Sequence, residues 1–259
     1  MTYENLNAIV RTFLRDEHMM ACCASLEKHY PGIQIVLVDD GYSTPEKREY
    51  YAGLRERGHI VEDTSLPFDS GCGAKWNLAA ALCTRPYILF CNDDYLFQGE
   101  RDGVDKMLRL LHGLIEGSVG VVCGTYNDID YQGWIKETPG RIEEFMCPKD
   151  GSLRYYPGIR WEFVDICACY GIMRRDVFTT GIRWDGRYKI GGEHGDWFMD
   201  VKKAGWRIVF TPDARINEGP GVTHPDYDSY RNRSDWKKIY REKHGPIVYK
   251  YFSGEEEQF

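Results

Sequence analysis

Short apolar runs alternate with helix-like segments along the first 125 residues, and this alternation restricts the fold more than any other feature. "IQIVLVDD" at 33–40 and "YILFC" at 87–91 have the length and aliphatic composition of buried parallel strands. A segment between them, which begins "TPEKREYYAGL", has Thr44 as a helix N-cap and Pro45 at its first helical position. Strands that alternate with helices predict an α/β fold built on a doubly wound, mostly parallel sheet.

The alternation of strands and helices stops after about residue 125. The longer stretches beyond it predict a smaller part of the fold, built from antiparallel strands. The stretches 127–147 and 153–173 are typical of twisted antiparallel strands, and "GDWFMDVKKAGW" returns to a helical pattern. "RIVFTP" predicts one more strand, and we expect the C-terminal tail to end as a helix. Because no linker, repeat or clean boundary separates these parts, the sequence predicts a single domain over residues 1–259.

The composition is that of a globular protein. Apolar residues make up 42% and charged residues 28% of the 259 residues, which is enough for a large buried core. No apolar stretch approaches the roughly 20 residues needed to span a bilayer, and the N-terminus "MTYENLNAIV" lacks the Lys or Arg of a secretory signal. The nine cysteines have neither CxxC nor zinc-site spacing, so we expect small buried side chains in a reducing compartment and a cytoplasmic protein.

The C-terminal tail, residues 225–259, differs from the rest of the chain in charge. The net charge of −7 disfavours a protein whose whole surface binds nucleic acid. Residues 225–252 nevertheless hold seven Lys and Arg residues interleaved with aromatic side chains. This mixture suits a solvated helix packed on the domain, a wall that stacks on sugars, a contact with a lipid diphosphate, or a contact with nucleic-acid phosphates.

Two predicted strands end in paired carboxylates, Asp39-Asp40 and Asp93-Asp94. Ligands of open α/β sheets bind beyond the carboxyl ends of the strands, so both pairs are expected to face one crevice. A single pair would more often cap the following turn, but two pairs in one sheet favour a site. Such carboxylates suit Mg²⁺ or Mn²⁺, which typically takes one or two of them together with substrate phosphates. The chain has no GxxxxGK[ST] loop and no GxGxxG after its first strand, so neither a P-loop nor a dinucleotide site is predicted.

A third cluster of polar residues opens the helical pattern near residue 195. Gly191 and Gly192 permit close approach of a ligand to the backbone, and they lead into Glu193 and Asp196. A carboxylate near a helix N-terminus is held ionised by the helix dipole, which suits a general base, although an ordinary acidic first turn has the same pattern. His224 follows the last predicted strand; alone it is more often structural, but beside a metal site it would serve as a ligand.

Together these segments resemble the inverting glycosyltransferases of the GT-A fold, especially the family 2 group and the related β-1,4-N-acetylgalactosaminyltransferases. The resemblance covers roughly residues 7–224 and is carried by "VRTFLR", "IVLVDDG", "GAKWNLAAALCTRPYILFCNDDYLF" and "YGIMRRDVFTTGIRWDGRYKIGGEHGDWFMDVKKAGWRIVFTPDARI". It implies a nucleotide-sugar-binding half at 1–125, an acceptor-side half at 126–224 and the tail at 225–259.

The resemblance also implies a donor-binding set. Asp39 is similar to the acid that hydrogen-bonds the nucleotide base, and Asp40 and Arg11 are implied to line the same pocket. Asn77 matches the asparagine of the family's Arg-Asn pair near the nucleotide. The residue before it is tryptophan instead of arginine in this chain, so Lys75 is expected to supply the positive charge.

For the metal and the base, the resemblance implies further roles. The segment Asn92-Asp93-Asp94 falls on the family's DxD metal motif, with Asp94 as the implied metal ligand and Asn92 and Asp93 facing the donor. His224 matches a histidine that often completes the metal site. Because a histidine follows Glu193 where many relatives carry the catalytic aspartate, we expect Asp196 to be the base, with Glu193 binding the acceptor or replacing Asp196 as base.

The implied activity is that of an inverting, metal-dependent glycosyltransferase. It would move a sugar from a nucleotide-diphosphate sugar, expected to be a UDP-sugar, to a hydroxyl of a glycan with the help of Mn²⁺ or Mg²⁺. A hydroxymethylated DNA base is the alternative acceptor, and a catalytically inactive protein that only binds sugar nucleotides is the alternative function. A nucleotidyltransferase is disfavoured because "VRTFLRDEH" has none of the glycines of its loop.

Overall fold

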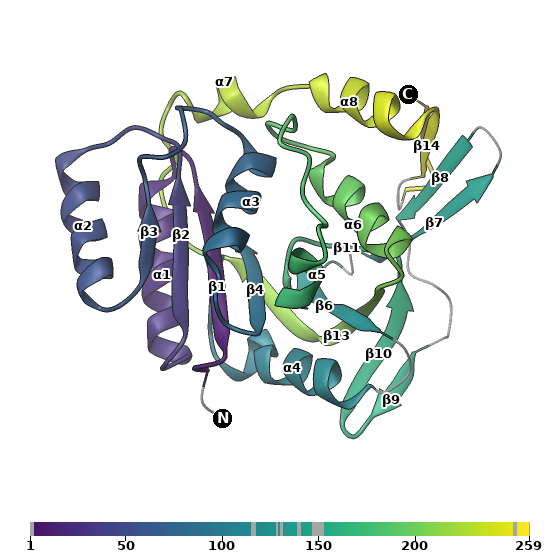
Figure 1. The fold of residues 1–259 in the computed structure, drawn as a ribbon, viewed down its shortest axis with the longest axis horizontal. Helices are drawn as coiled ribbons and strands as arrows, with labels where there is room; N and C mark the ends of the chain where they lie inside the picture. The colour runs from purple at the N-terminus through teal and green to yellow at the C-terminus, as the bar shows by residue number, and fades with distance from the viewer. Residues whose placement is uncertain are drawn as a thin grey trace.

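The computed structural model describes residues 3–114, 118–127, 129, 132–138, 141–146, 153–250 and 253–258; the side chains of 141 and 146 lie outside this description. Its largest element is a mixed sheet that crosses the molecule (Figure 1). The strands of this sheet are β1 (Leu6–Thr12), β2 (Gln34–Asp39), β3 (Ile60–Glu62), β4 (Tyr87–Asn92), β5 (Tyr95–Leu96), β6 (Val119–Tyr126), β9 (Arg154–Tyr156), β10 (Ile159–Val164), β12 (Gly171–Arg174) and β13 (Arg207–Glu218). Their order is β3-β2-β1-β4-β12-β6-β13-β10-β9, and β5 pairs with β13.

The core of this sheet is mostly parallel, as the sequence predicted. β1 is parallel to both β2 and β4, and β6 is parallel to β13. β12 lies between β4 and β6 and is antiparallel to both, and β10 is antiparallel to β13. In the register Arg11 lies beside Asn92 and Thr12 beside Asp39, so the carboxyl ends of three parallel strands lie side by side. This is the edge at which an open α/β sheet binds ligands.

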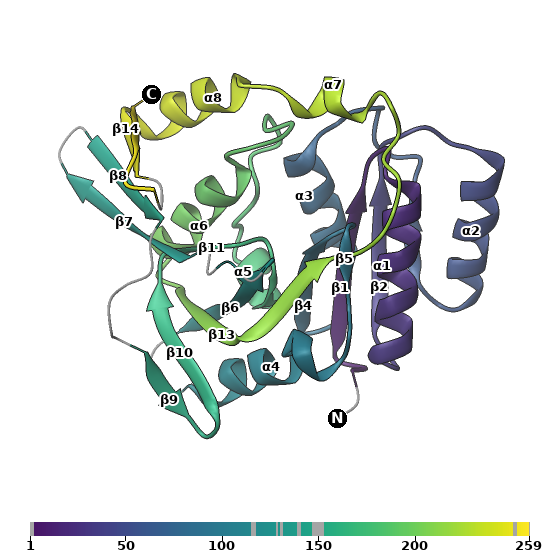
Figure 2. The same ribbon diagram turned by 180° about the vertical axis from the view of Figure 1, so that it is seen from behind.

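Helices cover both faces of the sheet (Figures 1 and 2). The helices are α1 (Asp16–His29), α2 (Pro45–Glu56), α3 (Cys72–Leu82), α4 (Val104–Gly113), α5 (Arg175–Thr179), α6 (Glu193–Lys203), α7 (Tyr227–Arg231) and α8 (Asp235–His244), with a 3-10 turn at Glu100–Asp102. Successive strand residues point to opposite faces, so Ile9 joins the core formed with α3, α5 and α6. Its neighbours Ala8 and Val10 join the core formed with α1, α2 and α4.

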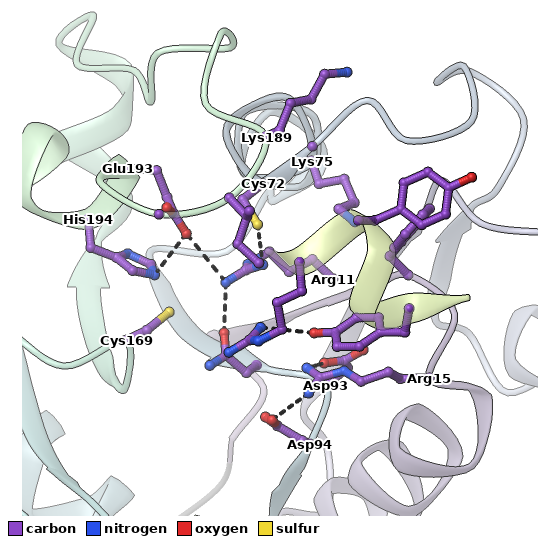
Figure 3. A pocket seen from close by; sticks show the side chains of 18 of the residues that line it. Arg11, Arg15, Cys72, Lys75, Asp93, Asp94, Cys169, Lys189, Glu193 and His194 are labelled. Carbon is purple, nitrogen blue, oxygen red and sulfur yellow. Dashed lines mark hydrogen bonds and ion pairs between the residues drawn. The ribbon is translucent and has the colours of Figure 1, made fainter. Parts of the chain in front are cut away.

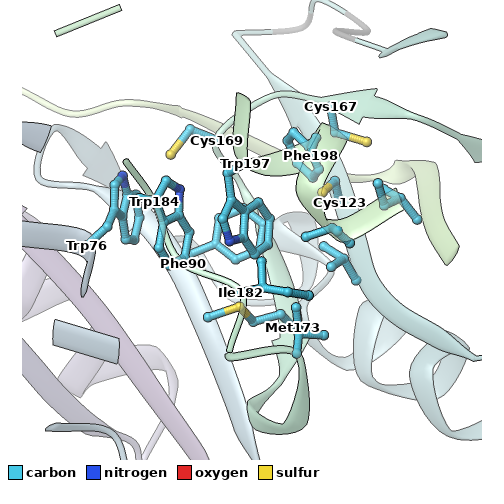
Figure 4. Close-up of a cluster of buried hydrophobic side chains, with 14 of the residues drawn as sticks. Trp76, Phe90, Cys123, Cys167, Cys169, Met173, Ile182, Trp184, Trp197 and Phe198 are labelled. Atoms are coloured by element: carbon cyan, nitrogen blue, oxygen red, sulfur yellow. The ribbon is translucent and has the colours of Figure 1, made fainter. Parts of the chain in front are cut away.

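Three stacked tryptophans hold α3 against α6 (Figure 4). Trp184 lies between Trp76 of α3 and Trp197 of α6, with ring centroids 5.2 and 4.5 Å apart and interplanar angles of 17° and 5°. All three side chains are buried, and such aromatic pairs contribute about 0.5–1.5 kcal/mol each beyond the burial of their area. The stack therefore fixes the relative position of two helices that begin at Cys72 and Glu193.

A second, smaller sheet lies beside the first. Its strands are β11 (Ile166–Cys167), β7 (Gln132–Thr138), β8 (Arg141–Met146), β14 (Ile247–Lys250) and β15 (Glu256–Gln258), in the order β11-β7-β8-β14-β15. The antiparallel pair β7 and β8 falls within the stretch where antiparallel strands were predicted.

The prediction that the tail ends as a helix is wrong. The tail does form α7, which lies above the carboxyl ends of β1 and β2, and α8, which lies above α6 (Figures 1 and 2), but it continues into β14 and β15. β14 pairs in parallel with β8. The sequence "IVYK" is rich in β-branched and aromatic residues, and it covers a strand edge that would otherwise leave its backbone groups unpaired.

Most other predicted elements are present. Pro45 opens α2, and the Thr44 hydroxyl accepts a hydrogen bond from the backbone N–H of Lys47 at 3.2 Å, as the N-cap prediction requires. The last strand of the main sheet is longer than predicted, because β13 continues to Glu218 past a register shift that spans Pro212. Such an irregularity accommodates proline, which has no N–H for the ladder.

Two further predictions concern the burial of the cysteines and the presence of membrane-spanning segments. The eight cysteines within the described ranges are buried and form no disulfide, as expected of small core side chains; Cys147 lies outside the described residues. Within the described part of the chain, no helix combines the length and the apolarity required to cross a membrane.

Candidate functional site

A pocket of about 380 Å³ opens at the carboxyl ends of β1 and β4 (Figure 3). It is lined by the end of β1 and the loop that follows, by the segment Asn92–Asp94, by the first turns of α3 and α6, and by α7 of the C-terminal tail. Segments that are far apart in the sequence therefore meet at the sheet edge where a site was expected from the acidic residues at the strand ends.

Asp93 and Asp94 share one guanidinium group. Arg15, in the loop after β1, donates from Nη1 to Oδ2 of Asp94 at 2.7 Å and from Nη2 to Oδ1 of Asp93. Both carboxylates are buried. Burial raises the pKa of Asp94, although the charge of Arg15 opposes that shift. Oδ1 of Asp94 is also buried and has no hydrogen-bond partner among the residues that the structure describes.

Arg11 connects the acidic segment to the opposite wall of the pocket. It donates from Nη2 to Oδ1 of Asn92 at 2.8 Å and from Nη1 to Sγ of Cys72 at 3.0 Å. Nη2 also lies 4.0 Å from Oε1 of Glu193, and the guanidinium lies over the ring of Trp76 at 4.7 Å. Arg11 thus places a fixed positive charge between Asn92 and Glu193.

Glu193 begins α6 and is buried in the pocket wall. Burial by itself would raise the pKa of Glu193, but His194 and Arg11 lower it below its usual value. Burial lowers the pKa of His194 to about 4, so at neutral pH Arg11 is the cation that remains beside Glu193. Oε1 of Glu193 lies 3.4 Å from Nε2 of His194, whereas Oε2 is buried without a partner in the described part of the chain. An ionised carboxylate with one unused oxygen can accept a proton from a bound hydroxyl.

Lys75 also lines the pocket, and Asp40 holds it there. Nζ of Lys75 donates to Oδ1 of Asp40 at 2.5 Å and to the carbonyl of Thr12 at 3.1 Å. Oδ2 of Asp40 accepts from the N–H of Gly71 at 3.0 Å, so both carboxylate oxygens are occupied inside the protein. Lys75 therefore lies in the pocket lining, where its role beside the donor stays a prediction. Asp40, which was expected to line the same pocket, is absent from the described lining and supports Lys75 from behind it.

Two predicted donor residues make internal contacts and are absent from the described lining of the pocket. The carboxylate of Asp39 accepts from the hydroxyl of Tyr51 at 2.7 Å, pairs with Nζ of Lys47 at 2.7 Å and accepts from the N–H of Gly41 at 2.9 Å. The side-chain amide of Asn77 exchanges hydrogen bonds of 2.7 and 3.0 Å with the backbone of Trp184. Both residues stabilise the walls around the strand ends.

Asp196 and His224 also lie apart from the described pocket lining. Asp196 is fully buried and its Oδ1 lies 2.5 Å from Nε2 of His244 and 2.9 Å from Nζ of Lys243, so it joins α6 to α8. His224 is 43% exposed at its side chain, and its ring packs against Tyr42 at 5.5 Å. The geometry thus separates Asp196 and His224 from the group formed by Arg11, Asn92 to Asp94 and Glu193.

Sequence reasoning missed several residues of the pocket. Tyr227, Tyr230 and Arg231 enter it from α7, and only their mixture of aromatic and basic character in the tail hinted at a ligand contact. Arg15 is the last residue of "VRTFLR", the segment quoted at the first strand, and this position was the available signal. The resemblance named Asp93 and Asp94 but not the cation that pairs with them.

The acidic pair has the chemistry of a divalent cation site. Asp93 and Asp94 supply hard oxygen donors, and Oδ1 of Asp94, which has no partner in the described ranges, fits an Mg²⁺ or Mn²⁺ ion that takes few protein ligands. Within the described ranges, no three His, Cys, Asp or Glu side chains gather into a complete ligand set. The remaining ligands of such an ion would include water and substrate oxygens.

Comparisons with known proteins identify relatives of the chain. The sequence profile described as "Glycosyl transferase family 2" matches residues 8–181. Human β-1,4 N-acetylgalactosaminyltransferase 1 is 30% identical over 186 residues, which cover 69% of this chain and 30% of the human protein. The mouse enzyme of the same name is 31% identical over 186 residues, with the same two coverages. The chain thus spans about 30% of the length of these curated relatives.

Solved structures with the same fold are more distant in sequence. GalNAc-T7 with UDP, GalNAc and Mn²⁺ superposes with a TM-score of 0.63 at 14% identity, over 91% of this chain and 46% of that one. TarS 1–349 of S. aureus with UDP-GlcNAc superposes with a TM-score of 0.61 at 15% identity, over 93% and 65%. The mannosyltransferase PcManGT of Pyrobaculum calidifontis with GDP-Man and Mn²⁺ gives 0.60 at 15% identity, over 93% and 61%.

At these identities the likeness to solved structures shows the fold, which is the GT-A fold that the resemblance implied. The profile match covers most of the chain and includes β1 from residue 8 on, the segment Asn92–Asp94, and β12 with its neighbours β4 and β6. The chain belongs to glycosyl transferase family 2.

Proposed function

We propose that the chain is an inverting glycosyltransferase that moves a sugar from a UDP-sugar to a hydroxyl of a glycan, with Glu193 as the base. The observation that carries the proposal is the buried carboxylate of Glu193, which shares the pocket with Asp93 and Asp94 and has one oxygen without a partner among the described residues. A single in-line displacement inverts the anomeric carbon and needs one base but no protein nucleophile. Glu193 is preferred to Asp196 because the described contacts of Asp196 are to α8.

In the proposed reaction, Oε2 of Glu193 accepts the proton of the acceptor hydroxyl. The acceptor oxygen forms a bond to the anomeric carbon while the bond from that carbon to the diphosphate breaks. Arg11, Arg15 and Lys75 offset the negative charge that develops on the leaving diphosphate, because all three are cations of the pocket lining. A divalent cation held by Asp93 and Asp94 would add to this stabilisation of the leaving group.

The proposed substrates follow from the relatives and from the lining of the pocket. The curated relatives are named N-acetylgalactosaminyltransferases, and two of the solved structures contain UDP or a UDP-sugar. We therefore propose a UDP-N-acetylhexosamine as donor. Tyr227 and Tyr230 supply aromatic faces of the kind on which sugar rings stack, which supports a glycan acceptor.

A thermal-shift panel of UDP-sugars and GDP-sugars, with and without Mn²⁺, tests the proposed function. A ligand that binds only the folded state adds RT ln(1 + [L]/Kd) to its stability, about 2.7 kcal/mol at a hundred times Kd. We expect a UDP-sugar with Mn²⁺ to raise the melting temperature most. Asp94→Asn should keep the fold and lose the increment that depends on Mn²⁺.

A matched assay separates an enzyme from an inactive binder. The UDP-sugar that binds most tightly is incubated without acceptor, and released UDP is measured with the wild type and with Glu193→Gln. We expect slow release from the wild type only. A panel in which no nucleotide sugar shifts the melting temperature would refute the proposal, and tight binding without release of UDP would favour the inactive binder.

A further inference from the structure

Arg15 is enclosed by groups that fix its guanidinium against the acidic pair. Its ion pairs with Asp93 and Asp94 join side chains that are 15%, 3% and 9% exposed. On another side the ring of Tyr227 lies 5.3 Å from the guanidinium carbon. Tyr227 belongs to α7, and its hydroxyl accepts from Nη1 of Arg231 at 2.9 Å. Arg15 therefore lies between the strand-end acids and the C-terminal tail.

The backbone at Leu14, directly before Arg15, adopts a strained conformation. Leu14 has a φ of 57°, in the left-handed region that branched, bulky residues rarely adopt, and it is buried. Its carbonyl accepts a hydrogen bond from the N–H of His224 at 2.9 Å, which ties the loop to the segment that leads into the tail. A strained residue persists where surrounding contacts determine its conformation, and such residues concentrate at functional sites.

The guanidinium also occupies carboxylate oxygens that a divalent cation would use. Oδ2 of Asp94 and Oδ1 of Asp93 both accept from Arg15, while Oδ1 of Asp94 has no partner in the described structure. A guanidinium and a divalent cation on the same two carboxylates would repel each other strongly in this buried site. Binding of one therefore opposes binding of the other.

We propose that Arg15 is a displaceable counter-ion of Asp93 and Asp94, which keeps the pair from binding divalent cations until the donor arrives. When the donor enters, its diphosphate accepts the guanidinium of Arg15, and the two carboxylates are released to the cation. Arginine suits this exchange, because its planar fork matches carboxylate and phosphate equally well. The inference rests on the proposed function, since it takes the diphosphate of a nucleotide sugar as the second partner of Arg15.

Mn²⁺ affinity of the donor-free protein tests this inference without any activity measurement. Free Mn²⁺ is followed by electron paramagnetic resonance during titration of the wild type, Arg15→Gln, Arg15→Lys and Arg231→Gln. We expect Arg15→Gln to bind Mn²⁺ at least about tenfold more tightly, because a neutral side chain replaces the competing cation. Arg15→Lys keeps the charge and should bind Mn²⁺ about as weakly as the wild type.

Arg231→Gln is the matched control, because it removes a cation of the same pocket that contacts Tyr227 instead of the acidic pair. It should leave Mn²⁺ affinity within about threefold of the wild type, since its charge is more distant and screened. Melting curves confirm that each variant is folded. Equal Mn²⁺ affinity of the wild type, Arg15→Gln and Arg15→Lys would overturn the inference.

The second arm measures UDP-sugar affinity at saturating Mn²⁺. Arg15→Gln should bind the donor about tenfold more weakly, because the diphosphate loses a charged partner. Unchanged donor affinity would overturn the transfer of Arg15 to the diphosphate. The wild type is measured in the same titration. If the wild type binds no UDP-sugar at all, the proposed function is wrong. If the wild type binds the donor but Arg15→Gln has unchanged Mn²⁺ affinity, only the inference about Arg15 is wrong.

Discussion

Two carboxylates three residues apart on α6 have opposite surroundings. Glu193 borders the pocket, and its pKa is held below its usual value despite burial. Asp196 is surrounded by Lys243 and His244 of α8. Spacing on a helix places both on a similar face, so sequence alone leaves either as a candidate base. The contacts made by the rest of the chain give them different roles in the structure.

Glu193→Gln should therefore reduce the rate of sugar transfer by about 10²–10⁴-fold while donor affinity changes little, because the amide occupies the same space but accepts no proton. Steady-state transfer and donor titration measure the two effects. Asp196→Asn is the control, and we expect it to lower the melting temperature because it weakens the attachment of α8 to α6. A folded Asp196→Asn protein with no transfer, beside an active Glu193→Gln, would identify Asp196 as the base.

At the scale of elements, α6, α8 and β8 meet around a buried polar cluster. The hydroxyl of Tyr240 on α8 donates to Oε1 of Glu144 on β8, and Asp196 of α6 lies close by. Burial and the negative charge of Asp196 raise the pKa of Glu144 to about 8. A buried carboxyl group that stays protonated is a neutral member of this cluster, so α8 is held by a combination of ion pairs and uncharged hydrogen bonds.

The stability of the protein should depend on the protonation of Glu144. Its pKa in the folded state, about 8, exceeds its ordinary value of 4.5, so between these values the folded state binds more protons than the unfolded state. The contribution is complete below pH 4.5 and is lost as the pH rises to about 8. Glu144→Gln should flatten this part of the stability curve, by an amount on the order of a few kcal/mol.

Denaturant unfolding of the wild type and of Glu144→Gln from pH 4.5 to 8.5 checks this expectation. The difference between their free energies of unfolding removes the contribution of groups that titrate alike in both proteins. Glu143→Gln provides the control, because successive residues of β8 point to opposite faces. The interpretation is wrong if the wild type and Glu144→Gln lose stability in parallel over this range.

At the scale of the whole molecule, the tail is less cationic than its sequence indicates. Several of its Lys and Arg residues are paired with carboxylates elsewhere in the protein or within the tail: Arg233 with Asp69, Lys243 with Asp196 and Asp200, Lys237 with Glu257, Lys238 with Glu242, and Lys250 with Glu256. Because these cations are neutralised within the protein and the chain has a net charge of −7, the tail provides little positive charge for binding a nucleic-acid duplex.

We therefore expect weak binding of duplex DNA with little dependence on salt. A protein that neutralises several phosphates loses affinity steeply between about 50 and 200 mM salt, by as much as 10³–10⁵-fold for six to ten contacts. Fluorescence anisotropy with unmodified and hydroxymethylated duplexes measures this dependence. Tight binding of the hydroxymethylated duplex that falls steeply with salt would favour the DNA acceptor over the glycan.

Features that depend on neighbours in the chain were predictable. The first-half strands and helices follow from local apolar patterns and caps such as Thr44, and parallel pairing brings Arg11 and Asn92 together at one edge. Asp93, Asp94 and Glu193 were named because they adjoin a strand end or a helix start. Lys75, in the first turn of α3, was named only through the resemblance, as a substitute for the arginine of the family's Arg-Asn pair.

Features that depend on distant segments were not predictable. Nothing near residue 227 indicates that Tyr227 lies over Arg15, and β14 is a strand because it pairs with β8, about a hundred residues earlier in the sequence. Asp39 and Asp196 were named from a strand end and a helix start, and Asn77 from the resemblance. In the structure their side chains bind Lys47, two residues of α8 and the backbone of Trp184, respectively.

The sequence by itself determined the order of elements in the first half, the parallel core and the collection of acids at the carboxyl ends of β2 and β4, because strand and helix patterns are local and parallel pairing leaves few arrangements. Tertiary structure alone decided which of those acids face the pocket and which cation pairs with Asp93 and Asp94. The physical reason is that burial and charge pairing are properties of the neighbours in space, and for these side chains the neighbours come from α7, α8 and the loop at Arg15.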